Sequence, residues 1–232
     1  MEELWNDIVL RQGNFRLGTD SVLLADFITL PKEAKIVDLG AGSGALGLLL
    51  CAKNEKCRVI GVEIDEEAHR LATENAAQNA LNRRLTPILG DVRKIRELLP
   101  ASSADCVISN PPYFPVHSGK IANAARSELT LNLNQLCQAA AWLLPSGGRF
   151  ALVHRPERLC DIFCALRENG MEPKRLRFVR HRIDAPICLV LIEARRGGKS
   201  GLTYESDLIE FHSDGTPTSA YRAAYHTGEI LP

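Results

Sequence analysis

Short apolar runs alternate along this chain with longer stretches in which apolar residues recur every three or four positions. The short runs predict strands, and the longer stretches predict helices. Leu133, Leu136, Ala140 and Leu144, for example, follow helical spacing, and that stretch stops at Pro145. Helices are expected at about 20–29, 44–54, 66–80, 130–144 and 156–169.

Strands are expected between these helices and after the last of them. Their approximate ranges are 36–39, 58–62, 86–89, the apolar run that ends at Ser109, 149–154, 174–180 and 187–194. Alternation of strands and helices is typical of an α/β fold with a mostly parallel sheet. Only a short polar link, around 182–186, joins the last two strands. We therefore expect a seven-stranded sheet with an antiparallel pair at one edge.

A glycine-rich turn follows the first of these strands, where residues 36–44 read IVDLGAGSG. Glycine is needed where the backbone turns tightly and approaches a ligand closely. The spacing also fits a dinucleotide site. However, a carboxylate at Asp38 suits the cationic amino-acid part of S-adenosylmethionine and would repel a pyrophosphate. Gly40, Gly42 and Gly44 are therefore predicted to hold S-adenosylmethionine.

Polar side chains also stand at the ends of the next three predicted strands. Because ligands in open α/β sheets bind at the carboxyl ends of strands, these side chains are expected to share one site. Glu63 is predicted to accept hydrogen bonds from the ribose hydroxyls of the cofactor, and Asp91 is predicted to accept one from its adenine amine. Asp65 is predicted to cap the following helix. The predicted cofactor contacts at these strand ends are Glu63, Ile64, Asp91, Val92 and Asn110.

Residues 110–114, Asn-Pro-Pro-Tyr-Phe, carry the predicted acceptor chemistry. The Asn110 side-chain oxygen and the Pro111 carbonyl can accept both hydrogens of a planar amine, so that its nitrogen pyramidalises as it attacks an electrophile. Tyr113, together with Phe114, can stack on a base. The candidate catalytic residues are Asn110, Pro111, Pro112 and Tyr113.

Three segments give the chain a family resemblance: FRLGTDSVLLA at 15–25, the motif at 110–113, and ARSELT at 125–130. Together with the glycine-rich strand and turn, they resemble the bacterial tRNA1(Val) adenine-N6-methyltransferase family. The resemblance implies a Rossmann-like class I methyltransferase fold and S-adenosylmethionine-dependent N6-methylation of adenine in tRNA beside the anticodon. In the first segment, Thr19 is predicted to cap a helix starting near Asp20, whose free N–H groups would face the cofactor.

Basic residues crowd one late segment, although the formal net charge of the chain is zero. We expect them to contact RNA phosphates, with affinity falling steeply as salt rises. The predicted substrate contacts are Tyr113, Phe114, Arg126, Lys174, Arg175, Arg177, Arg180, Arg182, Arg195 and Arg196. The stretch 116–129 has no clear periodicity and is expected to close over the base as a lid.

The bulk properties fit one domain of 232 residues. Its expected parts are an N-terminal segment at 1–35, a cofactor-binding core at 36–196 and a C-terminal extension at 197–232. The seven cysteines form no Cys-x-x-Cys pair and no stretch is apolar enough to span a bilayer, so we expect a cytoplasmic protein without disulfides or metal. The expected partner is a tRNA anticodon stem-loop, bound by a monomer or weak dimer.

Other activities share parts of this pattern. Glutamine-N5 methyltransferases of translation factors use the same Asn-Pro-Pro-Tyr chemistry, but they usually carry an extra helical N-terminal domain. Methylation of adenine in ribosomal RNA or DNA is also open. A non-catalytic cofactor-binding subunit would have no reason to keep Asn110 and Tyr113, and an NAD-dependent reductase would need a catalytic pair that the sequence does not offer.

Overall fold

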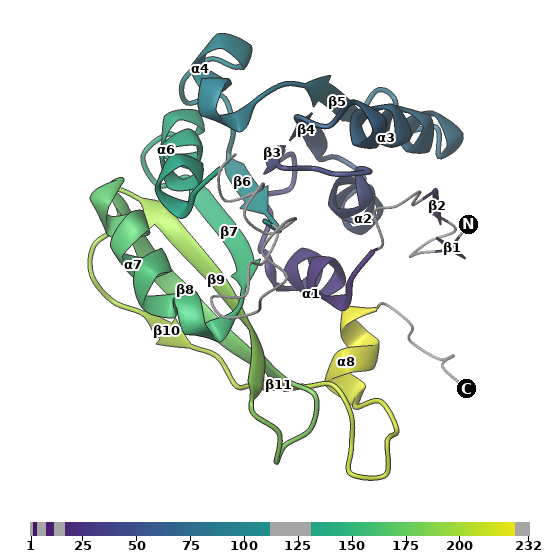
Figure 1. The fold of residues 1–232 in the computed structure, drawn as a ribbon, viewed down its shortest axis with the longest axis vertical. Helices are drawn as coiled ribbons and strands as arrows, with labels where there is room; N and C mark the ends of the chain where they lie inside the picture. Colours follow the sequence, from purple (N-terminus) through teal and green to yellow (C-terminus); the bar gives the residue numbers. More distant parts are fainter. Residues whose placement is uncertain (1, 4–7, 12–16, 112–130, 226–232) are drawn as a thin grey trace, which may run out of the picture.

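The computed structural model describes residues 2–3, 8–11, 17–111 and 131–225. One large mixed sheet dominates this part of the chain (Figure 1), with the order β10-β8-β9-β7-β6-β3-β4-β5 and with β11 also paired to β8. The strands of the parallel half are β3 (Lys35–Leu39), β4 (Arg58–Glu63), β5 (Leu85–Leu89), β6 (Cys106–Ser109) and β7 (Arg149–His154).

The antiparallel pairing expected late in the chain is confirmed. β8 (Met171–Arg180) pairs antiparallel with β9 (Ile187–Arg196), which pairs antiparallel with β7. β8 is not the outermost strand, however, because β10 (Thr203–Tyr204) and β11 (Leu208–Ile209) add to it in parallel. The sheet thus has nine strands where the sequence predicted seven. The added strands are two residues long, too short for a periodicity signal.

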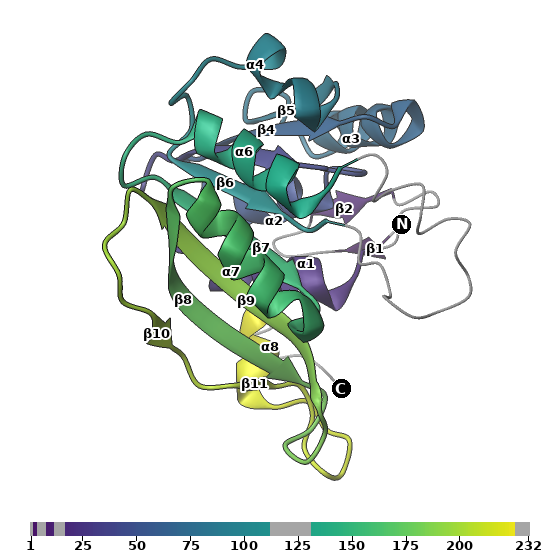
Figure 2. The same cartoon turned by 60° about the vertical axis from the view of Figure 1, so that its left-hand side comes forward.

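Helices cover both faces of the sheet (Figure 2). Alternate residues of β3 supply the two cores: Ile36 belongs to the cluster that contains Leu23 and Leu48, while Val37 belongs to the cluster that contains Leu136. The helices are α1 (Thr19–Phe27), α2 (Ala45–Lys53), α3 (Glu66–Gln78), η2 (Val92–Lys94), α4 (Ile95–Leu98), α6 (Leu133–Leu143), η3 (Pro156–Arg158), α7 (Leu159–Glu168) and α8 (Ser219–Ala224).

Two peripheral features complete the described chain. β1 (Glu2–Glu3) and β2 (Val9–Leu10) form a separate antiparallel pair, and α8 lies beside α1 (Figure 1). None of the helices in the described ranges combines the length and the apolar character needed to span a bilayer.

Candidate active site

The order of strands reverses between β3 and β6. From β3 the chain continues outward to β4 and then β5, whereas β6 lies on the other side of β3 and leads to β7. In α/β sheets, ligands bind at such a switch point, beyond the carboxyl ends of the strands. Asp38 is the register partner of Ile108 across this boundary, which sets Asn110 just beyond the sheet on the neighbouring strand.

The glycine-rich turn is held in a conformation that L side chains rarely adopt. Gly40, Gly42 and Gly44 have φ values of 77°, 55° and 80°. Two anchors fix the turn to β4: the Gly40 N–H donates to the Val62 carbonyl at 2.9 Å, and the Gly42 N–H donates to Glu63 Oε2 at 2.8 Å. The turn is therefore held as a fixed backbone cradle at the carboxyl end of β3.

Asp38 is the most unusual charged group of the site. Only 1% of its surface is exposed, and neither side-chain oxygen has a hydrogen-bond partner among the described residues. Burial raises the pKa of Asp38 to about 8, and the negative charge of Glu63 adds to the rise. A buried carboxylate with both oxygens unsatisfied is costly unless a cation binds there. The ammonium group of an amino-acid-like ligand fits this requirement.

Asn110 is held by a residue that the sequence analysis did not single out. Its Nδ2 donates to the Ser21 Oγ at 2.8 Å, joining β6 to α1 across 89 residues of sequence. This bond fixes which end of the amide is the donor, and so orients the acceptor Oδ1. Ser21 is itself 8% exposed, so the contact lies in the protein interior.

The other predicted cofactor contacts lie around the same edge. Glu63 Oε1 also accepts from the Asp65 N–H at 2.8 Å, so both of its oxygens already bind backbone amides. Asp91 pairs with the Arg93 side chain, whose hydrogen bonds lower the Asp91 pKa. Asp65 caps α3 through the Ala68 N–H, which confirms that prediction. Ile64 is 53% exposed and Val92 is buried.

The prediction that Thr19 caps α1 is wrong. The helix begins at Thr19, its N-cap is Gly18, and no side-chain cap bond is made. Asp20 Oδ1 instead accepts from the Ser21 N–H at 2.9 Å. The Thr19 hydroxyl, which was expected to cap α1, instead accepts a hydrogen bond from the Tyr225 hydroxyl at 3.1 Å.

Several predicted residues lie outside the described residues. They are Pro112, Tyr113, Phe114, Arg126 and the expected lid at 116–129. Pro111 is described and is half-buried, two residues after the end of β6.

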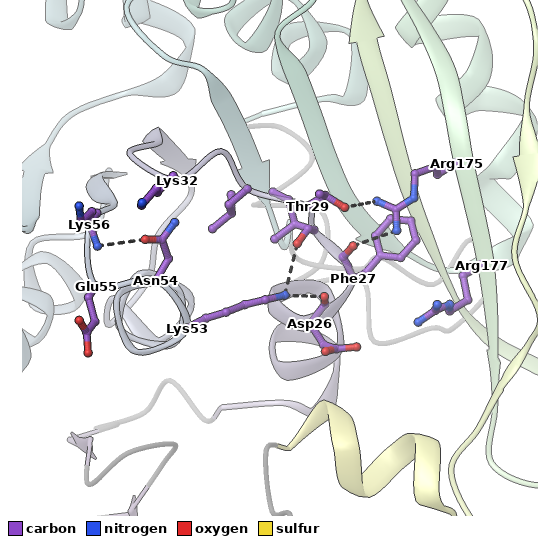
Figure 3. Close-up of a pocket in the computed structure, with 12 residues that line it drawn as sticks. Asp26, Phe27, Thr29, Lys32, Lys53, Asn54, Glu55, Lys56, Arg175 and Arg177 are labelled. Atoms are coloured by element: carbon purple, nitrogen blue, oxygen red, sulfur yellow. Dashed lines mark hydrogen bonds between the residues drawn. The ribbon is translucent and has the colours of Figure 1, made fainter.

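Two cavities stand out, and the larger is not at this edge. A cavity of about 120 Å³ is lined by residues that include Ser21, Asp38 and Asn110. Another, of about 640 Å³, lies at the opposite ends of α1 and α2 (Figure 3). There Lys53 donates to carbonyls at the end of α1, including that of Asp26 at 2.6 Å. Asp38 and Asn110 thus share the smaller cavity, whereas Lys53 in the larger one joins α2 to the end of α1.

The basic segment of β8 is largely paired within the chain. Arg175 binds Glu193 at 2.8 Å and Glu205 at 2.7 Å, Arg177 binds Glu205 at 2.6 Å, and Arg180 binds Asp207 at 2.8 Å.

The other basic residues that were predicted to contact RNA are spread along the sheet. Lys174 donates to the Lys199 carbonyl at 3.1 Å, and exposed Arg182 lies 3.4 Å from Asp184. Arg195 and Arg196 pair with the beginnings of β7 and β8, at the end of the sheet away from Asn110.

Comparison with known proteins shows the family to which the chain belongs. The family described as methyltransferase small domain matches residues 12–163. Two relatives named tRNA1(Val) (adenine(37)-N6)-methyltransferase come from Dickeya chrysanthemi and Photobacterium profundum. The first is 33% identical over 80% of this chain and 74% of its own length, and the second is 29% identical over 76% of each.

Solved structures share the fold. A predicted O-methyltransferase from Agrobacterium tumefaciens superposes with a TM-score of 0.74 at 23% identity, over 91% of this chain and 98% of its own. A putative RNA methyltransferase from Pyrococcus horikoshii gives a TM-score of 0.54 at 20% identity, over 76% and 81%. The glycine cradle, the buried carboxylate and these matches together show that the chain belongs to the methyltransferase small-domain family, among the tRNA1(Val) (adenine(37)-N6)-methyltransferases.

Proposed function

We propose that this protein transfers a methyl group from S-adenosylmethionine to N6 of an adenine in tRNA, at the position beside the anticodon. The observation that carries the proposal is the pairing of two groups at one sheet edge: the unsatisfied carboxylate of Asp38 and the oriented amide of Asn110. The names of the relatives support the choice of acceptor. We expect the enzyme to act in the cytoplasm on the anticodon stem-loop.

Residues of the cradle would hold S-adenosylmethionine, which supplies an electrophilic methyl on a sulfonium. Asp38 would pair with the ammonium group of the cofactor, which removes the cost of its unsatisfied oxygens. The backbone at Gly40 and Gly42 gives close approach without side-chain obstruction. Glu63 and Asp91 remain the proposed acceptors for the ribose hydroxyls and the adenine amine, since each carboxylate has further lone pairs to offer.

On the acceptor side, Asn110 and Pro111 would accept the two hydrogens of the adenine amine. These bonds favour the pyramidal nitrogen of the transition state over the planar ground state. Tyr113 and Phe114 are proposed to stack on the target base, and Arg126 to contact the RNA. A base in a single-stranded loop costs little to present. The amine proton becomes acidic only once the nitrogen has been methylated, so it can pass to water without a dedicated base.

Nucleoside mass spectrometry tests the proposal directly. The tRNA pool of a strain that lacks this gene should lose N6-methyladenosine at one position, and the purified protein should restore it. Asn110→Ala should abolish transfer while cofactor affinity stays within several-fold, whereas Asn82→Ala, at an exposed asparagine elsewhere, should change neither. Unchanged tRNA in the deletion strain, with methylation of a protein glutamine instead, would overturn the RNA assignment.

A further inference from the structure

A second cluster of reactive side chains lies far along the chain from the glycine-rich turn. His181 Nδ1, Cys188 Sγ and a carboxylate oxygen of Glu210 all lie within 4.8 Å of one another. We propose that these three side chains bind a single divalent metal ion of the zinc type, with water completing its coordination. The proposal does not depend on the methyl-transfer reaction.

Three neighbouring strands bring the ligands together. His181 directly follows β8, and Glu210 directly follows β11, which is parallel to it. Two backbone bonds lock these segments side by side: the Glu210 N–H donates to the Arg180 carbonyl and the Phe211 N–H to the His181 carbonyl, each at 2.9 Å. Two of the three ligands are therefore positioned by backbone pairing.

Cys188 reaches the cluster because of an irregularity in β9. Val179 pairs with Leu189, whereas the next residue, Arg180, pairs with Ile187, so Cys188 is the extra residue of a bulge. Bulges redirect a side chain at the edge of a sheet and often occur at sites. The bulge brings Cys188 Sγ beside Glu210 and His181, where it donates to the Val179 carbonyl at 3.3 Å.

The donor set suits zinc. Thiolate, imidazole and carboxylate are its usual ligands, and three protein ligands with an open position form a common arrangement. His181 Nδ1 now contacts Glu210 directly, and because its side chain is 69% exposed it can rotate to exchange that contact for a shared metal ion. The Glu210 side chain is only 4% exposed, so its carboxylate is shielded from water and would be stabilised by a bound cation.

The resting cluster has a proton that a metal would displace. Burial raises the pKa of the Cys188 thiol, and the charge of Glu210 raises it further. Glu210 also makes a very short contact with His181 Nδ1, which a shared metal ion would replace. Because metal ligation requires thiolate and neutral imidazole, binding should release protons.

The site has a structural consequence for the C-terminal extension. The Thr218 N–H donates to the Glu210 carbonyl at 2.9 Å, and Thr218 caps α8, whose C-terminal neighbour Tyr225 contacts Thr19 of α1. A metal at Glu210 would therefore fasten the start of this connection to β8 and β9.

The test uses the full chain in which two other exposed thiols are removed, Cys160→Ser with Cys164→Ser, so that they cannot bind metal. Calorimetry with Zn²⁺ should give one site per chain with proton release, and Co²⁺ should produce a thiolate-to-metal absorption band. His181→Ala and Cys188→Ser should each lower zinc affinity by at least about tenfold. Zinc should raise the melting temperature of the parent and not that of the variants.

If Cys188→Ser at the bulge disturbs folding, His181→Ala still tests the proposal, because His181 is exposed. Binding that both variants retain, or a Co²⁺ spectrum without a thiolate band, would show an adventitious ion only. Absence of any zinc binding would show that the cluster is a His181–Glu210 ion pair beside a thiol, and would overturn the proposal.

Discussion

Asp38 shows how a single buried residue can lower the stability of the folded protein. Its carboxylate is buried without a partner among the described residues, and its pKa is raised to about 8. The folded protein therefore holds a proton that the unfolded chain releases between about pH 4 and pH 8. Since the folded state binds more protons in this range, the free energy of unfolding contributed by Asp38 falls as pH rises.

Asp38→Asn should remove this penalty. The cofactor-free variant should melt at least about 3 °C above wild type near pH 7.5, because about 1 kcal/mol corresponds to roughly 2–4 °C in a chain of this size. The difference between the two proteins should narrow as pH falls and be small near about pH 4.5, because this pH lies close to the pKa of Asp38 in the unfolded chain. Thermal scans at both pH values measure the difference, and a variant that is less stable at the higher pH would contradict the argument.

Cofactor affinity should show the matching pH dependence. An ammonium group on the ligand favours ionised Asp38, so the dissociation constant for S-adenosylhomocysteine should fall by up to about twentyfold between about pH 6 and pH 7.5. Asp38→Asn should bind more weakly and lose this slope. Calorimetry across the range decides the matter, and the same slope in both proteins would mean that another group titrates.

Ser21 is expected to position Asn110 without touching the reacting atoms. Ser21→Ala removes the acceptor of the Asn110 amide, which should lower kcat by about three- to tenfold, the value of one ordinary hydrogen bond. Ser21→Thr keeps a hydroxyl and should recover most of the rate. The melting temperature and the cofactor dissociation constant serve as controls, and an unchanged kcat for Ser21→Ala would exclude the role.

At the scale of elements, β8 is a joint between the core and the C-terminal extension. Its arginines pair with carboxylates on both sides. Glu193 lies on β9, and Glu205 and Asp207 lie in the link between β10 and β11. Glu193 is 2% exposed, so its partner Arg175 compensates an almost fully buried charge. Most charges of the basic segment that suggested an RNA surface therefore form ion pairs within the protein.

Arg175→Ala should destabilise the protein by about 3 kcal/mol, because it leaves Glu193 buried without its cation. Arg182→Ala, at an exposed position, should change stability by less than about 0.5 kcal/mol. Urea unfolding of both variants provides the comparison. Equal and small effects would show that Glu193 is adequately solvated or paired without Arg175.

For the whole molecule, zero net charge means that RNA affinity depends on where cations remain accessible. The predicted cations occupy both ends of the sheet. Arg182 follows the end of β8 nearer the carboxyl end of β7, whereas Arg195 and Arg196 lie at the opposite end. We therefore expect an RNA bound at Asn110 to lie nearer Arg182 than Arg195 and Arg196.

Arg182→Gln should therefore weaken tRNA binding more than Arg195→Gln with Arg196→Gln. Each phosphate contact that is lost should reduce the slope of log affinity against log salt by about one. Filter binding over a range of salt concentrations measures this, with S-adenosylhomocysteine binding as the control. Equal losses in both proteins would mean that the RNA extends along the whole edge, and no loss in either would place the RNA surface elsewhere.

The sequence by itself determined the features that depend on neighbouring residues. The repeated strand and helix patterns, the tight glycine-rich turn, Asp38 at a strand end and the Asp65 cap were all predicted and found. They can be predicted because periodicity, turn chemistry and capping act over a few residues. The wrong cap at the start of α1, Thr19 for Gly18, differs from the observed one by a single residue.

Only the tertiary structure decided which distant side chains meet. Ser21 and Asn110 are 89 residues apart, and Thr19 and Tyr225 are 206 apart. The carboxylates that pair with the β8 arginines and the cluster around Cys188 also depend on strands that join late in the chain. No spacing rule predicts such contacts, because they follow from strand order, register and a single bulge, which are set when the whole sheet assembles.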